Sequence, residues 1–374
     1  MGPLDQNAHL KLERLLGYLA ADPSNAALLI DAIETALAAG TLNTAAELVE
    51  QLSGIRPDSF EAAYFSALLA MEGRDFEKAA NSLIPLVAAG APLNARFNLA
   101  WCQAMLGDKA QALANLDFAT TDTLASAAML RLQLMHEAGD IDAAYVFGQD
   151  ALERFPEDVG LLAAMATLAM DMEDVPLARH CAEKAGSHPE ALAALGLLDL
   201  QGGNIESARR SLEGSLAIRD HNPRAWVGQG LVRLLEREPA AAALDMDRGA
   251  QQFGDHIGSW IGAGWAHYLA GNLDAAEQRF ERALAIDPNF AESHGSLAVI
   301  DVAKGRTEAA KRRMITALRL DRNCFSALLA KIMLDADNPA LARDLVEQAF
   351  SSPLDENGMT VSAFLAGLTK PTIH

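Results

Sequence analysis

Apolar and polar positions in this chain follow the spacing of amphipathic helices. Trp260, Gly264 and His267 fall on one stripe at intervals of three and four residues. After a short polar turn, Ala276 and Phe280 form a second stripe with the same spacing. Such spacing places residues on one face of an α-helix. The pattern therefore predicts two helices that face each other, with small side chains where the backbones approach.

This two-helix pattern occurs four times between residues 189 and 324, at a period of 34 residues and without an insertion or deletion. Small residues recur at three fixed positions of the blocks, and a large apolar residue recurs at a fourth. The eighth position reads Gly196, Gly230, Gly264 and Ala298, and the twenty-fourth reads Leu212, Met246, Phe280 and Met314. A period of this length is typical of stacked helix–turn–helix units, which bury their apolar faces only against neighbours.

The repeated unit resembles the tetratricopeptide repeat (TPR), and its best copy spans residues 257–290. The matching positions in that copy are Trp260, Gly264, Gly271, Ala276, Phe280, Ala283 and Pro288. Two positions depart from the family pattern, because Ala263 replaces a leucine and His267 replaces a tyrosine. The resemblance implies an all-α fold, a right-handed superhelical solenoid of about ten helix–turn–helix repeats.

The match divides the chain into four stretches. We expect a capping helix in residues 1–25, divergent and acidic repeats in 26–188, regular repeats in 189–324, and a contracted repeat with a C-terminal cap in 325–374. The cap helices are expected near residues 7–21 and from Met359 to Leu368. Within the divergent stretch, the unit at residues 93–124 keeps Leu116 and Ala119 in register.

In proteins that this chain resembles, the first helices of successive units line a concave groove. Transferring the groove positions residue by residue gives an apolar surface at two places. The resulting candidate partner-binding residues are Phe97, Trp101, Met105, Arg224, Leu231, Leu235, Ile261, Trp265, Tyr268 and Leu269. A contiguous apolar patch is typical of a contact surface, and aromatic side chains often contribute most to binding.

Two arrangements fit these residues. They line an open groove, or they pack against neighbouring first helices in a tight superhelix and contact no ligand. The groove also lacks the lysine and asparagine of the family's clamp for chaperone C-terminal carboxylates, which argues against that subtype.

The chain is acidic, with a formal net charge of -20. Residues 1–188 contain 11 Lys and Arg against 26 Asp and Glu. An acidic surface repels phosphate backbones, so we expect no nucleic-acid partner. The same charge favours basic partners, although it also serves simply to keep a long apolar array soluble.

Composition places the chain among cytoplasmic proteins without a membrane span. Its three cysteines, Cys102, Cys181 and Cys324, cannot all pair, which favours reduced thiols. No signal peptide or long apolar run is visible, and the alanine-rich sequence suggests a bacterial source.

No catalytic, metal or cofactor motif survives inspection. His136-Glu137 begins like a zinc-protease motif, but Asp140 stands where the second histidine is needed. Gly228-Gln229-Gly230 lacks the third glycine of a dinucleotide fingerprint and lies in a predicted helix. We therefore expect no enzyme activity and no cofactor.

Three functional hypotheses remain open from the sequence. The leading one is a non-catalytic scaffold that binds an apolar or amphipathic segment of a partner protein in the concave groove. The second is a regulatory or targeting subunit of a multi-protein enzyme, secretion or polysaccharide-assembly system. The third is homo-oligomerisation through the solenoid ends.

Overall fold

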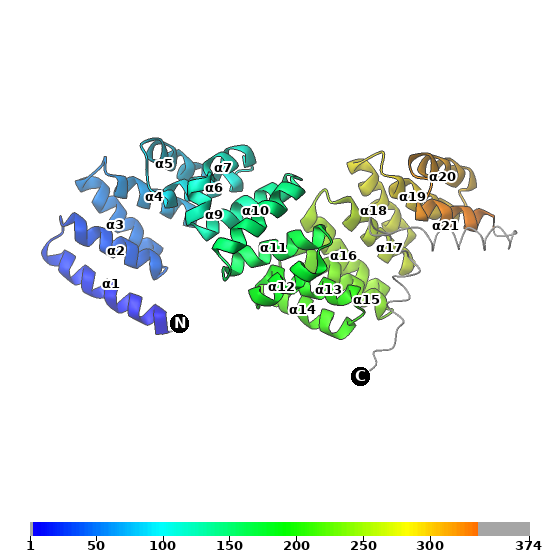
Figure 1. The fold of residues 1–374 in the computed structure, drawn as a ribbon, viewed down its shortest axis with the longest axis horizontal. Helices are drawn as coiled ribbons and strands as arrows, with labels where there is room; N and C mark the ends of the chain where they lie inside the picture. Colours follow the sequence, from blue (N-terminus) through cyan, green and yellow to red (C-terminus); the bar gives the residue numbers. More distant parts are fainter. Residues whose placement is uncertain (1–2, 336–374) are drawn as a thin grey trace. The chain divides into compact units, whose positions relative to one another are not determined.

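The computed structural model describes residues 3–335, and the regular elements in this range are all α-helices (Figure 1). The expected cap between Met359 and Leu368 lies outside the described residues, as does most of the contracted repeat. The helices group into two compact units, with the boundary between Leu161 and Leu162. The chain is therefore a helical repeat array of the TPR type in two parts.

The first unit starts with a long helix and continues as helix pairs. Its helices are α1 (Pro3–Ala21), α2 (Ala26–Ala38), α3 (Leu42–Ile55), α4 (Phe60–Glu72), α5 (Phe76–Ala88), α6 (Leu93–Met105), α7 (Lys109–Asn115), α8 (Phe118–Thr123), α9 (Ala125–Glu137) and α10 (Ile141–Arg154). Each pair packs internally, and α3 and α5 also contact the first helix of the following pair. The boundary between the units falls inside α11 (Val159–Asp171).

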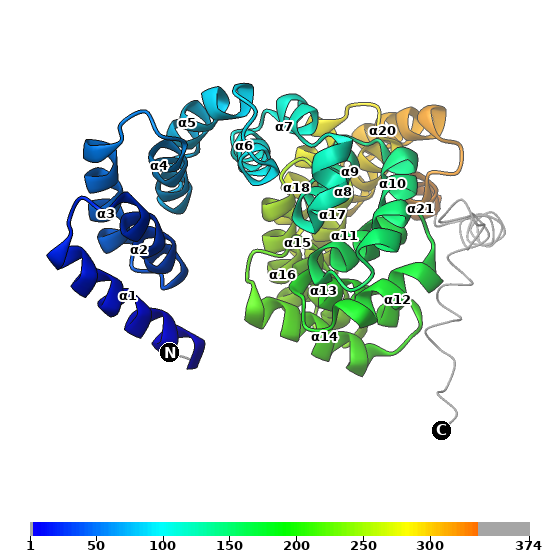
Figure 2. The same ribbon diagram turned by 60° about the vertical axis from the view of Figure 1, so that its left-hand side comes forward.

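The second unit contains the regular repeats. Its remaining helices are α12 (Val175–Ala185), α13 (Pro189–Gln201), α14 (Ile205–Ile218), α15 (Pro223–Leu235), α16 (Pro239–Phe253), α17 (Ile257–Leu269), α18 (Leu273–Ile286), α19 (Ala291–Ala303), α20 (Thr307–Leu320) and α21 (Phe325–Leu334). From α13 to α18 each helix packs against the next in the chain, and Figure 2 shows this group as the green to yellow part of the ribbon. First helices also contact each other directly, α13 with α15, α15 with α17, and α17 with α19.

The recurring small and large residues fit into each other within a helix pair. Phe280 of α18 is fully buried, and a Cβ atom built on Gly264 of α17 would lie 2.3 Å from its ring. Met246 and Gly230 make the same contact one block earlier, where the corresponding distance is 2.5 Å. A side chain at the glycine position would overpack the contact. The 34-residue period therefore records a repeated fit of one large side chain against one small one.

Turns between the helices also follow the sequence pattern. Gly271 lies in the turn after α17 with φ of +79°, a conformation that costs glycine little. Asn272 then caps α18, because its side chain accepts a hydrogen bond from the amide of Ala275 at 3.2 Å. At the other end, α18 stops at Ile286, just before Asp287-Pro288.

One position near the start of the first helix makes the same contact in three blocks. The indole N–H of Trp226 donates to the carbonyl of Asp220 at 2.8 Å, and that of Trp260 to the carbonyl of Gly254 at 2.6 Å. A ring nitrogen of His294 lies 2.9 Å from the carbonyl of Pro288. In each block a ring satisfies a carbonyl six residues earlier, where the preceding helix has ended. These contacts fix the entry into the next repeat.

The repeat at residues 93–124 differs from its prediction, because its second helix is broken. Leu116 is buried as expected, but α7 ends one residue earlier, and Asp117 then caps the short α8. Its carboxylate accepts bonds from the amide and hydroxyl of Thr120 at 3.0 and 2.7 Å. The restart shifts the helical phase, so Thr120 is buried and Ala119 is exposed. The expectation that Ala119 occupies the buried register was therefore wrong.

Arginines from three flanking helices stabilise this break. Arg96 of α6 forms an ion pair with Asp117, and Arg154 of α10 pairs with Asp122 at 2.8 Å. The guanidinium of Arg131 on α9 donates to the carbonyl of Leu116 at 2.5 Å. That carbonyl lies at the break, where the helix ladder no longer supplies a donor. The contacts hold the broken segment against its neighbours.

The three cysteines form no disulfide: Cys102, Cys181 and Cys324 are free and buried. In residues 3–335, no helix combines the length and apolar character that crossing a membrane requires.

Candidate partner-binding surface

Six of the apolar groove residues predicted in the second unit lie on α15 and α17. We call them the α15–α17 patch: Leu231, Leu235, Ile261, Trp265, Tyr268 and Leu269. Leu231, Leu235 and Leu269 expose 39%, 37% and 59% of their surface, respectively. The other three are half-buried. Since α15 and α17 are in direct contact, the exposed leucines belong to adjacent helices.

The two aromatic residues of the patch pack against each other and against the core. The Trp265 ring packs edge-on against Tyr268 and Phe280, with centroids 5.4 and 5.6 Å apart. Both Trp265 and Tyr268 contact the buried cluster that includes Leu297 and Ile300. The two rings are thus partly core, whereas Leu231, Leu235 and Leu269 are exposed.

Two aligned positions on the flanking helices α13 and α19 are buried. Val299, which corresponds to Leu231 and Trp265 two and one blocks earlier, is fully buried on α19. Leu200 of α13, which corresponds to Leu234 and Tyr268, is also buried. At the position of Leu231, the side chain is thus exposed on α15, half-buried as Leu197 on α13 and as Trp265 on α17, and buried as Val299 on α19.

Arg224 has a partner of its own within the second unit. Its guanidinium makes a two-pronged contact with the carboxylate of Asp171, at 3.1 and 2.8 Å. Such a pair is geometrically specific. Arg224 is therefore tied to α11.

A buried polar cluster joins α17 to the helices on either side of it in the chain, α16 and α18. Asp247 of α16 accepts two bonds from Arg279 of α18, both of 2.8 Å, and its carboxylate lies 3.0 Å from His267 Nε2 of α17. Burial opposes ionisation of Asp247, but the bonds from Arg279 and His267 outweigh it and hold its pKa below the usual value. His267, which replaces the family's tyrosine, thus joins three helices.

The predicted surface of the first unit is smaller. The rings of Phe97 and Trp101 are 6.3 Å apart, and both pack against a buried cluster that includes Leu116 and Leu130. Met105 is exposed at the end of α6. Leu106, the next residue, is exposed as well. The prediction missed Leu106 because it ends the helix and has no groove position in the repeat.

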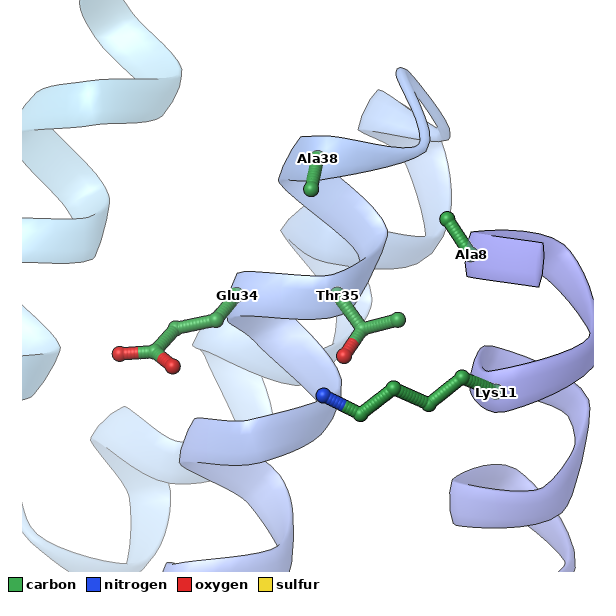
Figure 3. A pocket seen from close by; sticks show the side chains of 5 residues that line it. All are labelled: Ala8, Lys11, Glu34, Thr35 and Ala38. Carbon is green, nitrogen blue, oxygen red and sulfur yellow. The ribbon is translucent and has the colours of Figure 1, made fainter. Parts of the chain in front are cut away.

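A cavity of about 220 Å³ lies between α1 and α2 in the first unit. It is lined by Ala8, Lys11, Glu34, Thr35 and Ala38. Figure 3 shows Lys11 reaching from α1 toward Thr35, while Glu34 leaves α2 on the side away from α1. The Thr35 hydroxyl donates to the carbonyl of Asp31 at 2.7 Å and is thus already satisfied.

Chemically reactive groups are sparse in the part of the chain that the structure describes. Within it, no three His, Cys, Asp or Glu side chains gather as a metal site would require. Burial raises the pKa of the Cys102 and Cys181 thiols to about 11, so they remain protonated at neutral pH. Burial also raises the pKa of Cys324.

Sequence models described as "Tetratricopeptide repeat" match residues 64–119, 193–257 and 267–332, together half of the chain. The chain belongs to the tetratricopeptide repeat family. Repeats of this family imply a scaffold for protein–protein interaction.

Individual relatives are distant. The "Protein CTR9 homolog" of Arabidopsis thaliana is 27% identical over 169 residues, which cover 44% of this chain and 16% of that protein. The structure of IFIT1 with Gppp-AAAA aligns with a TM-score of 0.53 at 10% identity, over 87% of this chain and 90% of IFIT1. YrrB, "a TPR protein with an unusual peptide-binding site", aligns with a TM-score of 0.40 at 21% identity, over 49% and 97%. IFIT1 supports the fold alone, and this chain spans only a small part of its curated relative.

Proposed function

We propose that the protein is a non-catalytic scaffold whose α15–α17 patch binds an amphipathic helix of a partner protein. The observation that carries the proposal is the exposure of Leu231, Leu235 and Leu269 on two adjacent first helices. An amphipathic helix presents apolar anchors on one face, and an apolar strip on a rigid support suits such anchors.

The electrostatics around the patch favour an apolar contact. Arg224 is paired with Asp171, and Arg233 is paired with both Glu238 and Asp245. These pairs leave the cations near the patch already neutralised. With a formal net charge of -20, the chain as a whole also disfavours a nucleic-acid ligand.

Affinity capture from native lysate tests this proposal with a matched pair of variants. Leu269→Asp places a charge in the patch, whereas Leu244→Asp places one on α16, at a leucine exposed by 63%. We expect proteins bound by the wild type to be lost with Leu269→Asp and kept with Leu244→Asp, because a buried charge at an interface is costly. Trp265 is unsuitable for this test, since it packs against Phe280.

The control is circular dichroism, which should be the same for both variants. An identical set of captured proteins for wild type and Leu269→Asp would refute binding at the patch. It would then shift attention to Phe97, Trp101 and Met105, or to self-association, which sedimentation over a concentration series detects.

A further inference from the structure

One helix of the first unit displays an apolar side chain between acidic ones. On α10, Asp142, Val146 and Asp150 are spaced four residues apart and therefore share one face of the helix. All three are exposed, and Val146 exposes 66% of its surface. We call these three residues the acidic face, since a carboxylate lies one helical turn to either side of the valine.

The break in the repeat at residues 93–124 adds an aromatic ring to this region. The α8 helix contacts α10, and Arg154 of α10 pairs with Asp122 of α8 and with Asp150, at 2.8 and 2.6 Å. Phe118 lies one turn before Asp122 and is 72% exposed, while the restarted helix buries Thr120. The segment after the break thus presents an exposed ring on a helix that Arg154 joins to α10.

One helix of the second unit shows the same arrangement with the opposite charge. On α20, Arg312, Ile315 and Arg319 are spaced three and four residues apart and share one exposed face, which we call the basic face. Ile315 exposes 54% of its surface. Within residues 3–335 neither Arg312 nor Arg319 pairs with an acidic side chain, whereas Arg313 pairs with Asp301 at 3.2 Å.

The charge around each face has the sign of the face itself. Residues 117–158 contain 9 Asp and Glu against 2 Lys and Arg. Residues 307–322 contain 5 Lys and Arg against 2 Asp and Glu, in a chain with a formal net charge of -20. The basic face is therefore a local exception, and its electrostatic complement is present in the first unit of every other copy.

The two faces also match in spacing. Four residues of α-helix rise by about 6 Å, so the charges stand at similar distances from the central apolar residue on both helices. With Val146 packed on Ile315, each carboxylate of the acidic face lies opposite a guanidinium group, for parallel and antiparallel helices alike. We propose that the acidic face of one copy of this chain binds the basic face of a second copy.

Such a contact is heterologous, because it joins two different surfaces. Each copy in a dimer keeps one free face of either kind, so association continues beyond the dimer or closes into a ring. One helix packed against another buries little area, which makes the association weak and concentration-dependent. At an ionic strength of about 0.15 M the Debye length is about 8 Å, so facing charges outweigh the repulsion between distant acidic groups.

Charge reversal on each face tests the inference in the full chain. One variant combines Asp142→Arg with Asp150→Arg, and the other combines Arg312→Glu with Arg319→Glu. Each variant alone then carries two faces of like charge. In an equimolar mixture, every face again meets a face of opposite charge on the other variant. Sedimentation over a concentration series measures association of the wild type, of each variant and of the mixture.

We expect reversible association of the wild type, at least about tenfold weaker association of each variant alone, and recovery in the mixture. Raising the ionic strength from about 0.1 M to about 1 M shortens the Debye length from about 10 to about 3 Å and should weaken wild-type association. A wild type that stays monomeric over the whole series would overturn the inference. So would association that survives either double reversal, or a mixture that associates no better than its components.

A matched control changes the net charge equally but lies outside both faces. It combines Arg14→Glu on α1 with Arg210→Glu on α14, where Arg210 has the same repeat position as Arg312 and is also exposed. This variant should associate like the wild type, and a comparable loss would mean that net charge alone controls association. Circular dichroism checks that all variants are folded. The α15–α17 patch shares no residue with either face, so the proposed function can fail or hold independently.

Discussion

The repeats at residues 257–290 and 93–124 share one buried contact, but their second helices differ. Both bury a large side chain at the same position of the second helix, Phe280 in one and Leu116 in the other. After Phe280, α18 continues to Ile286 and buries Ala283. In the other repeat, α7 already stops at Asn115, Leu116 follows as its C-cap, and α8 begins at Phe118.

This difference separates two parts of a TPR-like unit. The contact between the large side chain and the first helix is present in both repeats, so it defines the pair. The rest of the second helix can be rebuilt when other groups satisfy the backbone, as Asp117 and Arg131 do at the break. The exposed Phe118 and the half-buried Asp117 belong to the rebuilt part.

The sharpest test of this comparison uses one phenylalanine from each repeat. Phe280→Ala should destabilise the protein by about 3–5 kcal/mol, because it empties a fully buried site. Phe118→Ala should change stability by less than about 0.5 kcal/mol, since that side chain is 72% exposed. Urea unfolding followed by circular dichroism measures both. A loss at Phe118 comparable to that at Phe280 would mean that α8 is packed more tightly than the structure indicates.

A smaller effect is expected from the glycine that faces Phe280. Gly264→Ala should destabilise the protein by about 1–3 kcal/mol, because the new methyl group would overlap the ring. Gly262 on the same helix is the control, since its nearest neighbour is Met246 Sδ at 3.8 Å. Gly262→Ala should stabilise by up to about 1 kcal/mol through helix propensity. Thermal unfolding measures the change in stability for each variant. If Gly264→Ala did not lower the stability while Gly262→Ala raised it, the close packing of Gly264 against Phe280 would be contradicted.

The stability contributed by a polar contact should also be larger at the repeat 257–290, which Asp247 of the preceding repeat contacts, than at the repeat 93–124. Asp247→Asn should cost about 1–3 kcal/mol, because it weakens a largely buried carboxylate that binds Arg279 and His267. Asp117→Asn should cost about 0.2–1 kcal/mol, since the pair with Arg96 is partly exposed and asparagine can still cap α8. Equal costs in urea titrations at neutral pH would contradict this ranking.

The effect of Asp247 should also depend on pH in a defined direction. Its pKa is lower in the folded chain, so its stabilisation is complete above the unfolded value of about 3.9. It is lost as the pH falls through the lower, folded value. The stability difference between wild type and Asp247→Asn should therefore narrow below about pH 4. A difference that stays constant from pH 7 to pH 3 would show that Asp247 does not act through its charge.

The helix pairs could be predicted from the local sequence, because the residues that define each pair lie close together in the chain. The fit of Gly264 to Phe280 spans a single turn between two helices, and Gly271 sets that turn. The break after Leu116 was not predicted, although Asp117 followed by Thr120 is a recognisable capping sequence. Leu116 and Ala119 both fitted the repeat pattern, so the pattern predicted a continuous helix where the structure has a break.

For the candidate surface, too, one feature could be predicted from the sequence and another could not. The sequence by itself determined that apolar residues of α15 and of α17 share one face of each helix, because the helical period fixes which residues lie on the same side. Only the tertiary structure decided which of these faces are open. Val299 is buried while Leu231 is exposed at the same repeat position, since exposure depends on how neighbouring helices approach. That approach depends on contacts between repeats, such as the Asp247 cluster across α16, α17 and α18, which no single repeat contains.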